Sequence, residues 1–113
     1  MDFTTLQQTA GRIAREHGFH DVNEQEPSTV DRKLMLIVGE IAEAQEDWRV
    51  HGAEPYTETR KEGVKPCGFG VELADAVIRI MDLCEQMNIP LERLLVEKMA
   101  YNETRPFKHG KRF

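Results

Sequence analysis

The chain has 113 residues, of which 40% are hydrophobic and 31% are charged, and its formal net charge is -5. This length and composition predict one soluble globular domain spanning residues 1–113 and exclude a disordered chain. The negative charge argues against a protein that grips a nucleic acid polymer, and no apolar run approaches the roughly 20 residues of a membrane span. Because the N-terminal segment lacks a basic region followed by an apolar core, we expect a cytoplasmic protein rather than a secreted one.

Apolar residues at spacings of three and four predict a first helix over residues 3 to 17, with Gly18 as its stop. Residues 19 to 28 are polar and contain a proline, which is typical of a connection. His20 lies in this connection, and we expect its side chain to be solvated rather than a metal ligand.

A second helix is predicted from a cap at Ser28 or Thr29 to about Val50. Its expected core stripe has the spacing of one helix face and consists of Leu34, Ile37, Ile41, Ala44 and Trp48. Gly39 costs this helix about 1 kcal/mol relative to alanine, so its presence predicts close approach of another backbone or of a ligand.

Residues 52–67 contain two prolines and two glycines without apolar periodicity, and they predict a long loop. Arg60, Lys61 and Lys65 in this loop could reach over an anionic substrate. Because glutamates are interspersed with them, a solvated mixed-charge loop is the default interpretation, and the two alternatives stay open.

A third helix is predicted from about residue 70 to 87 and a fourth from Pro90 to just before Pro106. The fourth is expected to bury a stripe made of Leu91, Leu94, Leu95 and Met99. No segment has a convincing strand pattern. The predicted fold is therefore an all-α four-helix bundle, in a chain small enough to gain from oligomerising.

Two pairs of acidic residues lie inside the predicted second and third helices. Glu40 and Glu43 are three residues apart, as are Glu72 and Asp75, so each pair projects from one helix face. If the two helices pack together, four carboxylates converge and repel one another unless cations lie between them. The pattern predicts either a metal site or two acidic, solvated helix faces.

The residue types in this cluster favour particular metals. Carboxylates without histidine or cysteine indicate Mg²⁺, with Mn²⁺ as an alternative, over zinc or iron. Cys67 and Cys84 have no metal-binding spacing and are expected to be free thiols. Arg79 shares the face of Glu72 and Asp75, either orienting an acid or forming a plain salt bridge.

A basic face lies near the C-terminus. Residues 98–113 contain five lysine or arginine residues against one acidic residue. Lys98, Asn102 and Arg105 share one face of the predicted fourth helix, where two cations could hold phosphate oxygens opposite metal ions. An acidic centre with a basic tail suits a metal-bound polyphosphate better than a polynucleotide.

Three segments carry a resemblance to a known family. GEIAEAQEDW (39–48), KPCGFGVELADAVIRIMDLC (65–84) and KMAYNETRPFKHGKRF (98–113) together resemble the MazG-like family of all-α nucleoside triphosphate pyrophosphohydrolases. The family pattern is ExxE, a gap of about one or two dozen residues, and ExxD. The gap here, 28 residues between Glu43 and Glu72, is at the long end of that pattern.

The resemblance implies a four-helix MazG-like bundle that hydrolyses an NTP or dNTP to the monophosphate and pyrophosphate, in nucleotide-pool house-cleaning. It implies that Glu40, Glu43, Glu72 and Asp75 hold two or more Mg²⁺ ions, with Glu40, Glu43 or the nearby Glu46 accepting the proton of the attacking water. Lys98, Asn102 and Arg105 match family positions that contact phosphate or sugar. The resemblance also implies a homodimer or homotetramer whose subunits complete each other's sites.

Two other functions are compatible with the sequence. The chain could be a non-catalytic oligomeric helical module that binds a protein partner, with its acidic residues as solvated faces. It could also be a phosphoribosyl-ATP pyrophosphohydrolase, because those enzymes share the fold and the carboxylate chemistry. The sequence does not disclose the nucleobase.

Overall fold

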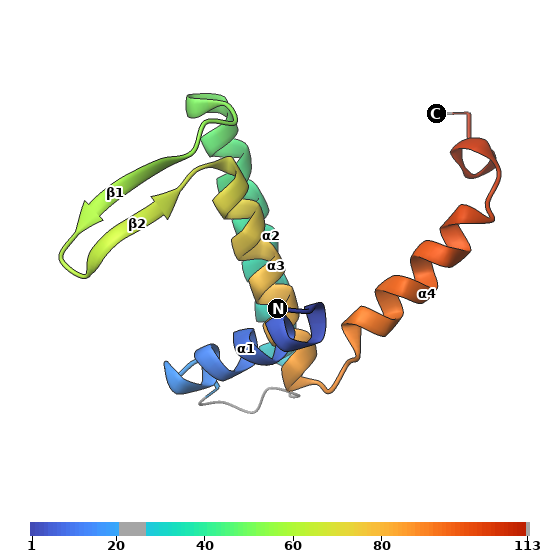
Figure 1. Cartoon of the computed structure of the whole chain (residues 1–113), viewed down its shortest axis with the longest axis horizontal. Coiled ribbons are helices and arrows are strands. Elements are labelled where there is room, and N and C mark those ends of the chain that lie inside the picture. Colours follow the sequence, from blue (N-terminus) through green and yellow to red (C-terminus); the bar gives the residue numbers. More distant parts are fainter. Residues whose placement is uncertain (21–26, 113) are drawn as a thin grey trace.

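The computed structural model describes residues 1–20 and 27–112, and residues 21–26 of the predicted connection lie outside it. The described chain is mostly helical, with one two-stranded sheet (Figure 1). Its elements are α1 (Phe3–Glu16), α2 (Pro27–His51), β1 (Tyr56–Arg60), β2 (Gly63–Cys67), α3 (Phe69–Gln86), α4 (Leu91–Glu103) and the short 3-10 helix η1 (Phe107–Gly110). None of these helices combines the length and apolar character that a membrane span needs.

Local signals explain where the helices begin and end. The Asp2 carboxylate accepts a hydrogen bond from the backbone N–H of Thr5 at 2.8 Å and so caps α1. α2 begins at Pro27, a residue type favoured at the first helical position, so the predicted cap at Ser28 or Thr29 is wrong. Asn88 has a φ of 56°, in the left-handed region, and follows the end of α3 as predicted.

α2 and α3 lie side by side along most of their length (Figure 1). Small residues on their facing sides allow close approach, since Ala44 of α2 is 2% exposed and Ala76 of α3 is 3% exposed. This pair of helices is the scaffold that carries all four predicted metal ligands.

α1 crosses the end of α3 that is farther from the hairpin (Figure 1). At the crossing, a Cβ on Gly11 would lie 2.6 Å from Cγ of Glu85, so only glycine fits there without a shift. Gln7 is buried nearby and donates hydrogen bonds to Glu85 and to the backbone carbonyl of Ile89.

His20 is not solvated as predicted. Its Nε2 lies 2.9 Å from Oδ1 of Asp82, the two side chains are only 10% and 16% exposed, and Gln86 also bonds to the imidazole. The pairing tethers the end of the α1 segment to α3.

Residues 52–67 are not a loop as predicted, because they contain a β-hairpin. β1 and β2 pair antiparallel, with Tyr56 opposite Cys67 and Glu58 opposite Lys65. Both are edge strands, so Pro66 can be accommodated despite its missing N–H. The hairpin projects from the end of the α2–α3 pair (Figure 1).

The predicted core stripes are largely exposed in the single chain. Of the α2 stripe only Ala44 is buried, whereas Ile41 and Trp48 are about half exposed, and none of the described residues of α4 is buried. The radius of gyration is 16.8 Å, against about 13 Å for a compact domain of this length. α4 contributes to this extension, because it leaves the other helices and meets α1 near the Thr4–Glu92 hydrogen bond (Figure 1).

Gly39 does not mark a close approach within the chain. A Cβ built on it meets no atom within 4 Å, so the prediction of a neighbouring backbone there is wrong for the described residues. Cys67 and Cys84, by contrast, are free thiols as predicted, and both are buried.

Candidate metal centre

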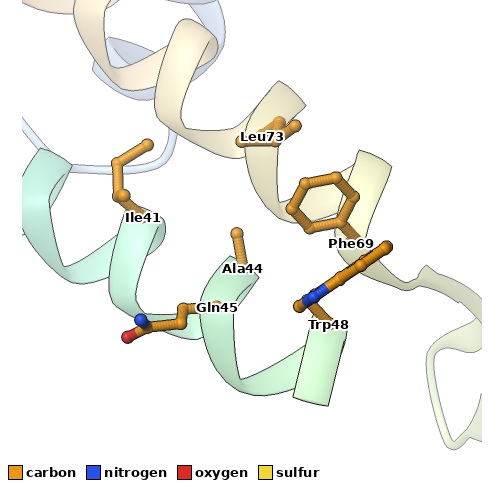
Figure 2. A pocket seen from close by; sticks show the side chains of 6 residues that line it. All are labelled: Ile41, Ala44, Gln45, Trp48, Phe69 and Leu73. Carbon is orange, nitrogen blue, oxygen red and sulfur yellow. The ribbon is translucent and has the colours of Figure 1, made fainter. Parts of the chain in front are cut away.

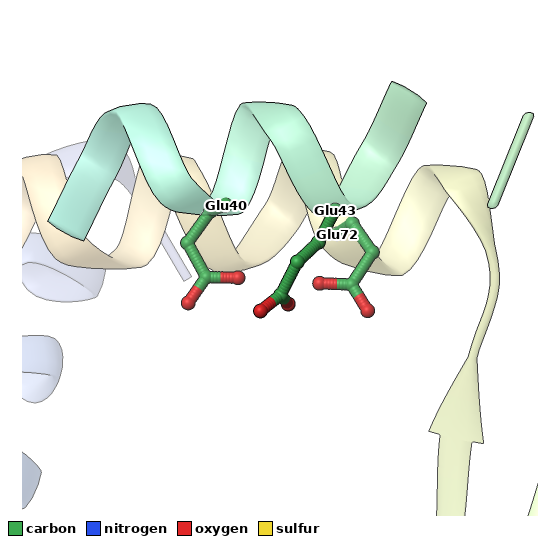
Figure 3. Close-up of side chains that lie close together, drawn as sticks. All are labelled: Glu40, Glu43 and Glu72. Atoms are coloured by element: carbon green, nitrogen blue, oxygen red, sulfur yellow. The ribbon is translucent and has the colours of Figure 1, made fainter. Parts of the chain in front are cut away.

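Three of the four predicted ligands converge on one side of the α2–α3 pair (Figure 3). Glu40 and Glu43 project from adjacent turns of α2, and Glu72 projects from the first turn of α3 to meet them. One oxygen from each carboxylate lies within 4.8 Å of the others. Each pair is brought to one side by the helical period, and the packing of α2 on α3 brings the two pairs together.

The fourth predicted ligand, Asp75, lies outside this closest group. It lies one turn further along α3, and Glu40 and, more weakly, Glu43 repel its negative charge. Partial burial and the charge of Glu40 raise the pKa of Asp75, and the positive charges of Lys65 and Arg79 oppose this rise. Asp75 therefore borders the cluster.

Electrostatic repulsion is concentrated on Glu72. Burial, followed by the charge of Glu43 and hydrogen bonds to Glu40 and Glu43, raises the pKa of Glu72 to about 7 from 4.5. Near pH 7, Glu72 is therefore protonated in a part of the molecules when no cation is bound. Hard, all-oxygen donors at this spacing fit a divalent ion such as Mg²⁺ or Mn²⁺.

Arg79 forms a salt bridge to Glu40, a contact that both of its predicted roles, orienting an acid and pairing with it, would produce. Its Nε donates to Oε1 of Glu40 at 2.8 Å, and the Glu40 side chain is only 13% exposed. The contact holds the orientation of Glu40 and occupies one of its two oxygens.

The hairpin extends the cluster into a groove of about 230 Å³. Its lining combines α2, α3 and both strands, and consists of Glu43, Glu46, Asp47, Tyr56, Glu58, Lys65, Cys67 and Glu72. The hydroxyl of Tyr56 donates to Asp47 at 2.8 Å and anchors the hairpin to α2, and this bond raises the pKa of Tyr56 to about 12. The sequence interpretation named Lys65 as able to reach an anionic substrate but missed Tyr56, Glu58 and Cys67 as lining residues. The signal in the sequence was the spacing of two residues between positions 56 and 58 and between positions 65 and 67, which places each pair on one face of a strand.

The predicted phosphate-binding residues lie elsewhere in the single chain. Lys98 and Asn102 are on α4, which diverges from the α2–α3 pair (Figure 1), and Arg105 lies just beyond the C-terminal end of that helix. The ammonium of Lys98 and the guanidinium of Arg105 lie over the ring of Tyr101 on the same helix, at 4.8 and 5.8 Å. One chain alone does not bring this basic face to the carboxylates.

A separate, apolar groove lies between α2 and α3 (Figure 2). It has a volume of about 400 Å³ and is lined by Ile41, Ala44, Gln45, Trp48, Phe69 and Leu73. The rings of Trp48 and Phe69 lie 5.5 Å apart in a tilted arrangement. These side chains include part of the predicted core stripe of α2, which is left open to solvent in the single chain.

Comparison with known proteins gave no match, whether against family models, curated proteins or solved structures. The chemical capacity of the chain is therefore argued from its own residues. They form a converging set of carboxylates with a protonatable member, an arginine that fixes one of them, and a lysine-bearing hairpin beside them.

Proposed function

We propose that this chain is a Mg²⁺-dependent nucleoside triphosphate pyrophosphohydrolase of MazG-like type, which converts an NTP or dNTP to the monophosphate and pyrophosphate. The observation that carries the proposal is the convergence of Glu40, Glu43 and Glu72, with oxygens within 4.8 Å of one another. Anions held this close are stabilised by a divalent cation, and a metal-bound triphosphate is the substrate that such a cation serves.

Each acidic residue has a role in this proposal. Glu40, Glu43, Glu72 and Asp75 would hold Mg²⁺, or Mn²⁺ in its place. When bound, the metal would polarise the phosphates and activate a water. Arg79 keeps Glu40 oriented. Glu40 or Glu43 would accept the proton when water attacks the α-phosphorus and pyrophosphate leaves, because a carboxylate within hydrogen-bond reach of a water can act as a general base.

Assembly is the second part of the proposal. The exposed apolar groove and the extended shape support a homodimer or homotetramer, in which a second subunit covers these surfaces. In such an assembly, α4 of one subunit would bring Lys98, Asn102 and Arg105 toward the phosphates held by the other. This arrangement would account for the distance between the basic face and the carboxylates in a single chain.

The test is pyrophosphate release from the eight common NTPs and dNTPs, with and without Mg²⁺. We expect release from at least one of them with Mg²⁺, and a loss of orders of magnitude in Glu43→Gln and Asp75→Asn. Glu16→Gln on the exposed side of α1 is the matched control and should keep full activity. Circular dichroism confirms that each variant is folded. Equal turnover by parent and carboxylate variants across the panel would sink the proposal.

A non-catalytic oligomeric module is the second candidate, and the exposed apolar side chains of α2 and α4 favour it. In that case the carboxylates are solvated faces, and Mg²⁺ with nucleotide should leave the melting temperature unchanged. Stabilisation by Mg²⁺ with nucleotide that disappears in Glu43→Gln would count against it. Adding phosphoribosyl-ATP to the substrate panel separates the third alternative.

A further inference from the structure

The hairpin presents one of its two faces to the carboxylate cluster. Successive side chains of a strand point to opposite faces, and directly paired residues share a face. Tyr56 and Glu58 of β1 are therefore on the same face as their partners Cys67 and Lys65 of β2. All four line the groove with Glu43 and Glu72, whereas Thr57 and Val64 are on the other face and exposed.

The base of the hairpin is held in place. Tyr56 is hydrogen bonded to Asp47, and its ring lies 4.4 Å from that of His51. At the same base of the hairpin, Gly68 follows the last residue of β2. It has a φ of 123°, and a Cβ there would lie 3.2 Å from Cα of Pro55. These contacts fix the direction of both strands relative to α2 and α3.

Lys65 brings a positive charge into an acidic groove. Five carboxylates line this groove, and among the described residues Lys65 is its one lysine or arginine. Glu58, directly across the sheet, is paired with Arg60 at 2.7 Å, and in the described chain Lys65 itself has no carboxylate oxygen within 4.0 Å. Lys65 thus lines the groove beside Glu43 and Glu72, and no ion pair among the described residues occupies its ammonium.

We propose that Lys65 binds the phosphates of the metal-bound nucleotide, so that the hairpin supplies a substrate-binding cation to the carboxylate site of its own chain. This inference rests on the proposed function. Once divalent ions neutralise the carboxylates, the strongest remaining partner for the ammonium is a phosphate oxygen. A lysine binds phosphate as a point charge, and it needs no fixed orientation of the kind that arginine requires.

The opposing possibility is that Lys65 serves as an internal counter-ion to the acidic residues. The two roles predict opposite effects of Lys65→Gln. A phosphate ligand is lost in the first case, so nucleotide binding weakens and binding of Mg²⁺ alone does not. In the second case a competitor of the metal is removed, so Mg²⁺ binds more tightly and the nucleotide is unaffected.

Isothermal titration with the α,β-imido analogues of the eight common NTPs and dNTPs in Mg²⁺ tests the inference without turnover. For Lys65→Gln we expect about a tenfold or greater loss of affinity, the size of one charge-assisted contact. Lys65→Arg should retain most of the affinity. Lys61→Gln, in the hairpin turn and outside the groove lining, is the matched control and should bind within about twofold of the parent. Mg²⁺-tripolyphosphate, which has no base, should show the same loss as the nucleotide.

The outcomes separate the two proposals. If the parent binds an analogue and Lys65→Gln binds it equally well, the role of Lys65 is wrong and the proposed function stands. Weaker binding of Mg²⁺ alone by Lys65→Gln would assign Lys65 to the architecture of the site and would also overturn the inference. If the parent binds none of the analogues with Mg²⁺, both proposals fail.

Discussion

The raised pKa of Glu72 shows that bringing the carboxylates together is unfavourable in free energy when all of them are ionised. Burial and the charge of Glu43 raise its pKa to about 7, so Glu72 ionises at a higher pH in the folded chain than in the unfolded chain. A site that raises the pKa of a carboxylate in this way gains stability when a cation replaces the proton. The same repulsion that destabilises the metal-free chain therefore favours metal binding.

The pH dependence of stability in the absence of metal follows from Glu72. Its folded-state pKa lies above the unfolded value of 4.5, so its contribution is fully present below pH 4.5 and is lost as the pH rises through about 7. The loss is on the order of 1 kcal/mol after allowance for solvent at a partly exposed carboxylate. Melting temperatures in EDTA from pH 4 to 8 should fall over this range, and less so for Glu72→Gln. Glu103→Gln on exposed α4 should follow the parent, and parallel curves for all three proteins would contradict the assignment.

Metal binding should release protons near neutral pH. Between pH 5.5 and 7 a part of the Glu72 population is protonated, and Mg²⁺ requires the ionised form. Mg²⁺ is titrated at pH 6.5 in two buffers of different ionisation enthalpy. The difference between the two binding enthalpies should equal the fraction of a proton released, multiplied by the difference between the two buffer ionisation enthalpies. Affinity should rise with pH and level off above about 7. A heat that is independent of the buffer at pH 6.5 would argue against Glu72 as a ligand.

At the scale of elements, the helix ends of α1 and α3 were predictable because their signals are local. Gly18 and Asn88 stop their helices within the span that the sequence predicts. The hairpin was not predictable in the same way, because its alternation is between polar residues and its turn, Lys61-Glu62, lacks the usual Asn-Gly or Asp-Gly signal. Strand pairing here depends on anchoring to α2 through Tyr56, which is a tertiary contact.

The candidate site was predictable in part, because some of its geometry is local to one helix. The helical period places Glu40 beside Glu43 from the sequence alone, and their meeting with Glu72 depends on α2 packing against α3, as expected. The position of α4 depends on the short connection after α3, whose direction no periodicity encodes. The predicted core stripes of α2 and α4 are wrong for the single chain, where most of their side chains are exposed, because apolar periodicity marks a helix face and does not specify what packs against it.

Two helical glycines test the distinction between open space and close packing. Gly39→Ala adds a Cβ into open space, so we expect a gain of up to about 1 kcal/mol from helix propensity. Gly11→Ala has the same propensity gain but sets a Cβ against Glu85, and overpacking of this kind costs about 1–3 kcal/mol. Urea unfolding of both variants should rank Gly39→Ala above Gly11→Ala. The reverse order would show that α1 does not pack on α3 as described, or that a partner subunit contacts Gly39.

At the scale of the whole molecule, the described chain is more extended than a compact domain of its size. Its radius of gyration is 16.8 Å, and no large side chain of the described residues is fully buried. The core consists mainly of small or sulfur-containing side chains, so the hydrophobic stabilisation available to one chain is limited. Association that covers the apolar groove would add burial that the single chain lacks.

Assembly through the apolar groove should therefore be sensitive to a charge placed within it. Ile41 lines the groove and is 49% exposed in the single chain, so Ile41→Glu costs little there but buries an unpaired carboxylate if a second subunit covers the groove. We expect sedimentation velocity to show a dimer or tetramer for the parent and a shift toward monomer for Ile41→Glu. Val64→Glu, on the outward face of the hairpin and 67% exposed, is the matched control and should assemble like the parent.

Because assembly contributes to stability, the melting temperature of the parent should also rise with protein concentration. A parent that sediments as a monomer at all concentrations would refute assembly, and unchanged assembly in Ile41→Glu would place the interface on another surface.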